Sequence, residues 1–112
     1  MLNATTVHIR FSASEGFAPG KVADAELTFS GGLLDGLLLR GFGVWFRHGS
    51  YAVTYPAVRW GTGPGHQAMA LLRPDPAQGL AGERGSAALE EFIVRHCRLW
   101  LRQQQRQQAV RS

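Results

Sequence analysis

Within residues 4–11 the apolar residues Val7, Ile9 and Phe11 alternate with polar ones, and within residues 21–30 the same alternation recurs at Ala23, Ala25, Leu27 and Phe29. A period of two residues is typical of a β-strand that has one buried face and one solvated face. The dipeptide Pro19-Gly20 lies between the two stretches and favours a turn. The pattern therefore predicts two amphipathic strands joined by a loop.

The next stretch is dense in Tyr, Val, Phe and Trp and predicts a hairpin, with strands over residues 37–46 and 51–56. Both faces of its first strand are apolar or glycine, so we expect each face to be covered. A further short strand is predicted over residues 67–73, because Pro74 cannot continue a sheet ladder. Together these segments predict an antiparallel sheet of four to five strands in meander order.

Arg40 does not fit this alternation, because it falls on the same face as Leu38, Phe42 and Val44. A β-bulge near Gly41 would reset the register, since glycine inside a strand often marks a bulge. Alternatively, the segment 33–39 turns separately. Periodicity leaves both arrangements open.

A long helix is predicted over residues 86–107, with residues 108–112 as a frayed tail. Ser86 can cap its start, and Glu90 and Glu91 suit the positive end of the helix dipole. Apolar or weakly polar residues then recur at three- and four-residue spacing and form one stripe: Leu89, Phe92, Ile93, His96, Cys97 and Trp100. The predicted fold is one α+β domain over residues 1–112, in which an antiparallel β-sheet carries the long C-terminal helix on one face.

Charge is distributed unevenly along the 112 residues. The formal net charge is +4; residues 1–83 contain six basic and six acidic residues, whereas residues 84–112 contain six arginines and two glutamates. Cys97 is the single cysteine, so no disulfide can form within the chain. The N-terminal residues do not resemble a signal peptide, and no window is apolar enough for a membrane helix. We therefore expect a cytoplasmic protein without membrane contact.

The predicted helix carries a row of arginines opposite its apolar stripe: Arg95, Arg98, Arg102 and Arg106. Spacings of three, four and four residues place them on one side of a helix. Such a row can simply be a solvated helix face, or it can contact the phosphates of DNA or RNA, because a guanidinium matches phosphate oxygens. Arg47 in the hairpin turn and Arg59 beyond it are predicted as secondary contacts.

The sequence predicts no catalytic residues, no metal site and no cofactor. The four histidines lack metal-ligand spacing: His8, His48, His66 and His96. Gly61, Gly63 and Gly65 lack the lysine and hydroxyl of a phosphate-binding loop. No acid, base and nucleophile form a convergent set, so a non-enzymatic protein is expected.

Three segments carry a family resemblance: ADAELTF at 23–29, LLLRGFGVWFRHGSYAVTYPAVRW at 37–60 and LEEFI at 89–93. Over about residues 5–100 the chain resembles the SpoVG septation-regulator family of small bacterial proteins. The resemblance implies an antiparallel sheet with a C-terminal helix, dimerisation, and binding of DNA or RNA as a regulator. It places Pro56 and Arg59 on the family's proline-and-basic motif, although Ala57 and Val58 stand where small polar and basic residues are usual.

These observations support two functional hypotheses. The first is a nucleic-acid-binding regulator that uses the helix arginines and forms a homodimer by burying the second apolar face of the hairpin. The second is a protein-interaction or assembly module, in which the hairpin recruits a partner and the helix arginines are only solvated.

Overall fold

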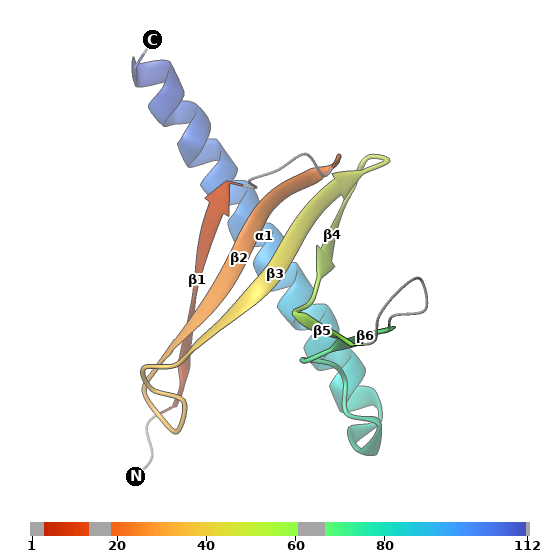
Figure 1. Cartoon of the computed structure of the whole chain (residues 1–112). Helices are drawn as coiled ribbons and strands as arrows, with labels where there is room; N and C mark the ends of the chain where they lie inside the picture. Colours follow the sequence, from red (N-terminus) through yellow and green to blue (C-terminus); the bar gives the residue numbers. More distant parts are fainter. Residues whose placement is uncertain (1–3, 14–18, 61–66, 112) are drawn as a thin grey trace.

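The computed structural model describes residues 4–13, 19–60 and 67–111, with the backbone alone for residues 59, 60, 67, 68 and 111. Four antiparallel strands form the main sheet in the order β1-β2-β3-β4. Their bounds are Thr6–Ala13 (β1), Lys21–Ser30 (β2), Leu38–Arg47 (β3) and Ser50–Thr54 (β4). The helix α1 (Leu80–Arg111) crosses one face of this sheet (Figure 1). The predicted α+β fold is thus confirmed.

The hydrophobic core lies between the sheet and α1. Its fully buried residues come from three elements: Ala23, Ala25 and Leu27 on β2, Phe42 and Val44 on β3, and Ile93 and Cys97 on α1. Because side chains alternate across a strand, the intervening residues of β2 and β3 point to the opposite side of the sheet. We call that side the open sheet face.

A bulge at Gly41 decides the facing of Arg40. Ala25 pairs with Phe42 and Glu26 pairs with Arg40, so β3 contains one residue more than β2 at this point. Gly41 has φ +108°, a conformation that side chains disfavour, and Pro56 packs directly against it. Arg40 therefore lies beside Glu26 on the open sheet face, and the first of the two alternatives holds.

The same bulge corrects two expectations about β3. Leu38 does not share the face of Phe42 and Val44; it is 46% exposed, and Leu39 packs against the core instead. The second face of β3 is also not uniformly apolar, because it carries Arg40. The open sheet face is consequently charged, and it is not a hydrophobic surface that another element must bury.

The helix starts earlier and ends later than predicted. A 3₁₀ turn, η2 (Pro76–Gln78), is capped by Asp75 and leads through Gly79 into α1 at Leu80, six residues before Ser86. Gly82, in the added part of the helix, packs closely against the preceding segment: a Cβ there would lie 3.1 Å from Asp75 N and from Pro74 Cβ. At the other end α1 continues to Arg111, so the expected frayed tail is helical up to that residue.

Two short strands form a separate sheet, in which β5 (Ala57–Trp60) pairs with β6 (Gln67–Ala70). The strand predicted over residues 67–73 therefore ends earlier and does not extend the main sheet, and β5 was not predicted as a strand of its own. The backbone N–H of Leu71 donates to the carbonyl of Pro56 (2.7 Å), which closes this unit beneath the buried Pro56. Residues 61–66, which contain the glycine motif, lie outside the described residues.

The molecule is extended for its size. Its radius of gyration is 16.4 Å, against about 13 Å for a compact domain of this length. The C-terminal part of α1 projects beyond the sheet, which accounts for much of the difference (Figure 1). Within the described residues, no helix combines the length and apolar character needed to cross a membrane.

Candidate nucleic-acid interface

The four helix arginines Arg95, Arg98, Arg102 and Arg106 are all exposed and form what we call the basic ridge. The ridge faces away from Ile93 and Cys97, which α1 buries against the sheet. Arg106 lies eleven positions after Arg95, so the ridge is roughly 16 Å long at a rise of 1.5 Å per residue. Among the described residues, none of the four guanidinium groups forms an ion pair with a carboxylate. Their charge is therefore presented directly to solvent.

A shallow groove of about 510 Å³ runs along the first part of the ridge, lined by Glu91, Val94, Arg95, Arg98, Leu99 and Arg102. Leu99 is 47% exposed and lines the groove together with Val94. Three cations and one carboxylate also line the groove, so it is positively charged and includes apolar side chains. Such a surface suits an anionic partner that also presents apolar groups.

Arg47 lies apart from the ridge. It follows Trp45 on the open sheet face, and its guanidinium carbon lies 4.5 Å from the Trp45 ring centroid. Its Nε and Nη2 donate to the carbonyl of Pro19 at 3.2 Å and 2.8 Å. Since the sheet separates it from the outer side of α1, Arg47 and the ridge cannot contact one continuous small surface.

Arg59, the other predicted secondary contact, lies in β5 opposite Ala68, and its side chain is outside the described part of the chain.

The aromatic residues of the hairpin serve mainly in packing. The indole N–H of Trp45 donates to Thr54 Oγ1 (3.0 Å), while Tyr55 packs edge-on against Phe42 and its hydroxyl lies 3.1 Å from Ser86 Oγ on α1. Their rings are therefore committed to internal contacts.

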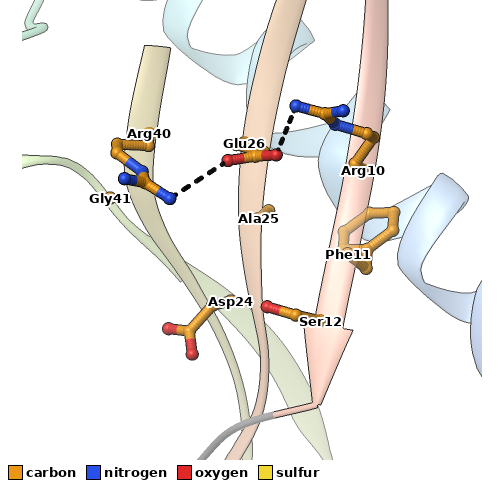
Figure 2. Close-up of a pocket in the computed structure, with 8 residues that line it drawn as sticks. All are labelled: Arg10, Phe11, Ser12, Asp24, Ala25, Glu26, Arg40 and Gly41. Carbon is orange, nitrogen blue, oxygen red and sulfur yellow. Dashed lines mark ion pairs between the residues drawn. The ribbon is translucent and has the colours of Figure 1, made fainter. Parts of the chain in front are cut away.

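The open sheet face holds a charged cluster that sequence reasoning missed. Arg10, Glu26 and Arg40 lie directly opposite one another on β1, β2 and β3. Figure 2 shows the two guanidinium groups converging on Glu26 from either side. The polar positions of the alternating strands were visible in the sequence, but their alignment depends on the strand register and on the bulge at Gly41.

Two titratable groups have shifted pKa values, and both are held in their neutral form. Burial raises the pKa of the Cys97 thiol to about 11. Burial also raises the pKa of Tyr55; a nearby Glu90 adds to this effect, and a hydrogen bond with Ser86 opposes it. Neither group is activated as a nucleophile or a base at neutral pH.

Comparison with known proteins finds no match for this chain: no family model, no curated protein and no solved structure. The resemblance to the SpoVG family therefore stays a prediction.

Proposed function

We propose that the protein is a small, non-enzymatic bacterial regulator of the SpoVG kind that acts in the cytoplasm by binding DNA or RNA through the basic ridge. The observation that carries this proposal is the alignment of four exposed guanidinium groups on one side of α1, unpaired with carboxylates among the described residues. The row matches a phosphate backbone, which is itself a row of charges.

The charge distribution supports the same proposal. Residues 1–83 are formally neutral, so they neither oppose nor screen the ridge. Each guanidinium has five N–H donors and can contact a phosphate with two of them at once. The proposal is confined to the ridge, because Arg47 is bonded to Pro19 on the other side of the sheet.

The test is fluorescence anisotropy at low salt with labelled duplex DNA, single-stranded DNA and RNA. We compare a ridge variant, R98Q/R102Q, with a control variant, R73Q/R84Q. Both lose two positive charges at exposed positions, so they are matched in net charge and differ in where the charge is removed. We expect the ridge variant to lose binding and the control to retain it. Equal loss in both would refute the ridge, because it would show that net charge alone attracts the ligand.

Salt dependence measures how many arginines are in contact. On duplex DNA each phosphate contact contributes about 0.9 to the slope of log affinity against log salt, so four contacts give a slope of up to ~3.6. Each single replacement, such as Arg102→Gln, should lower the slope by about 0.9. A slope that does not change would contradict a phosphate contact at that arginine.

A second function, self-association or binding of a protein partner, is favoured by a separate observation. The turn between β2 and β3 and the first residue of β3 expose four leucines: Leu33 (93%), Leu34 (40%) and Leu37 (56%) in the turn and Leu38 (46%) in β3. The turn is held by backbone hydrogen bonds and by Asp35, whose carboxylate accepts from the Gly31 N–H (2.7 Å). Rigid, exposed apolar surface of this kind is typical of an interface.

We propose that this leucine patch, Leu33, Leu34, Leu37 and Leu38, supports a homodimer. Light scattering after size exclusion should give the mass of a dimer for the wild type and of a monomer for Leu33→Asn/Leu37→Asn. A dimer that survives both replacements would locate the interface elsewhere. A monomeric wild type that binds no nucleic acid but recovers a protein partner through the same leucines would favour the interaction module.

A further inference from the structure

A depression of about 310 Å³ lies on the open sheet face, across the centre of β1, β2 and β3. Four charged residues, three small residues and one phenylalanine line it, as Figure 2 shows: Arg10, Asp24, Glu26 and Arg40; Ser12, Ala25 and Gly41; and Phe11. The charged side chains rim the space, while the side chain of Ala25 points into the core, where it is 4% exposed. The hollow exists because Ala25 and Gly41 place no side chain on the open face.

The carboxylates at this site are already neutralised by cations. Glu26 meets Arg10 at 2.6 Å (Nη2 to Oε1) and Arg40 at 3.7 Å (Nη2 to Oε2), and Asp24 meets Lys21 at 2.5 Å. The lining itself holds two guanidinium groups and two carboxylates. Because Asp24 is paired with Lys21, which lies outside the lining, the two guanidinium groups face Glu26 as the one carboxylate that they share, and this favours a small anion.

The two guanidinium groups keep most of their hydrogen-bonding capacity. The 3.7 Å separation between Arg40 and Glu26 is longer than a hydrogen bond, and the Arg40 side chain is 79% exposed. The Arg10 side chain is 62% exposed, and its Nη2 forms the ion pair with Glu26. Each group has five donors, so both can bind a further acceptor without giving up the contact with Glu26.

We propose that this depression binds a small molecule through an oxyanion, a carboxylate or a phosphate monoester, held between Arg10 and Arg40. Ser12 on the β1 side offers a hydroxyl donor to the same group. The volume of about 310 Å³ lies at the lower end of the range of small-molecule sites. The site is on the opposite side of the sheet from α1, so it is independent of nucleic-acid binding at the basic ridge.

The experiment is a titration of the ¹⁵N-labelled protein with acetate and, separately, with inorganic phosphate, followed by amide chemical shifts. Sodium chloride at matched ionic strength is the reference for unspecific salt effects. We expect saturable shifts centred on Ser12, Glu26 and Gly41. The arm with the stronger response identifies the preferred oxyanion, planar carboxylate or tetrahedral phosphate.

Three variants make the proposal specific. Arg40→Gln, at an exposed position that leaves the core intact, should weaken binding about tenfold, as expected for the loss of one charge-assisted hydrogen bond. Glu26→Gln should strengthen binding, because it removes a negative charge that repels an oxyanion placed beside both guanidinium groups. Arg84→Gln, an exposed arginine on α1, should have no effect.

The proposal is overturned if chloride produces the same shifts as both oxyanions, or if the affinity is unchanged in Arg40→Gln. Arg10→Gln serves as a second variant and should reproduce the loss from the other side of the depression. A native-like amide spectrum of each variant before titration shows that its loss of binding is local.

Discussion

Replacing Gly41 with alanine should destabilise the protein through two separate effects. The first is the backbone: φ is +108°, and an L-residue held at such an angle costs about 1–3 kcal/mol. The second is contact, because a Cβ at this position would lie 3.2 Å from Pro56 Cβ, and Pro56 is buried and cannot move freely. Overpacking of this kind typically adds about 1 kcal/mol or more. The free energy of unfolding, measured by urea denaturation, should therefore fall by about 2–4 kcal/mol.

Two other glycines serve as comparisons for Gly41. Gly36 also has positive φ, +84°, but a Cβ there meets nothing within 4 Å, so Gly36→Ala measures the backbone cost alone. Gly85 lies in the second turn of α1 with open space around it, and Gly85→Ala should stabilise the protein by about 1 kcal/mol, the difference in helix propensity. If Gly41→Ala costs no more than Gly36→Ala, the packing of Pro56 on the bulge does not matter for stability.

Two further predictions concern the core between α1 and the sheet. Ile93→Ala should lower the free energy of unfolding by about 2–5 kcal/mol because Ile93 is fully buried, whereas Leu99→Ala on the same helix, 47% exposed, should cost under about 1 kcal/mol; equal losses would contradict the described facing of α1. The pKa of Cys97 is raised from 9.0 to about 11, so its contribution to stability is complete below pH 9 and is lost as pH rises through about 11. Between pH 9 and 11 the free energy of unfolding of Cys97→Ala, measured by urea denaturation, should fall less than that of the wild type. An identical pH dependence in both proteins would show that the thiol has the same pKa in the folded and unfolded states.

The strands and the helix were predictable because their patterns are local. The range of β2, residues 21–30, was predicted correctly, since its alternation is unbroken and bounded by Gly20 and Gly31. The start of α1 was not, because Gly82 and Gly85 lower helix propensity. The helix starts at Leu80 in a region where Gly82 packs against Pro74 and Asp75, and the spacing of residues in the sequence does not predict this contact.

The candidate sites divide in the same way. The basic ridge follows from helical periodicity alone, and the structure places its four arginines together on the exposed side of α1. The sequence could not show that Arg47 lies apart from the ridge. Its position in the hairpin does not reveal which face of the sheet the helix covers. The cluster of Arg10, Glu26 and Arg40 required the register of three strands, which the bulge shifts by one residue.

The sequence by itself determined the α+β class, the apolar face of α1 and the row of arginines opposite it, because each depends on the spacing of residues within one element. Tertiary structure decided the facing of Arg40, the extent of α1 and the charged depression on the open sheet face. These depend on how separate elements are aligned, and a shift of one residue in a strand moves every side chain beyond it to the other face.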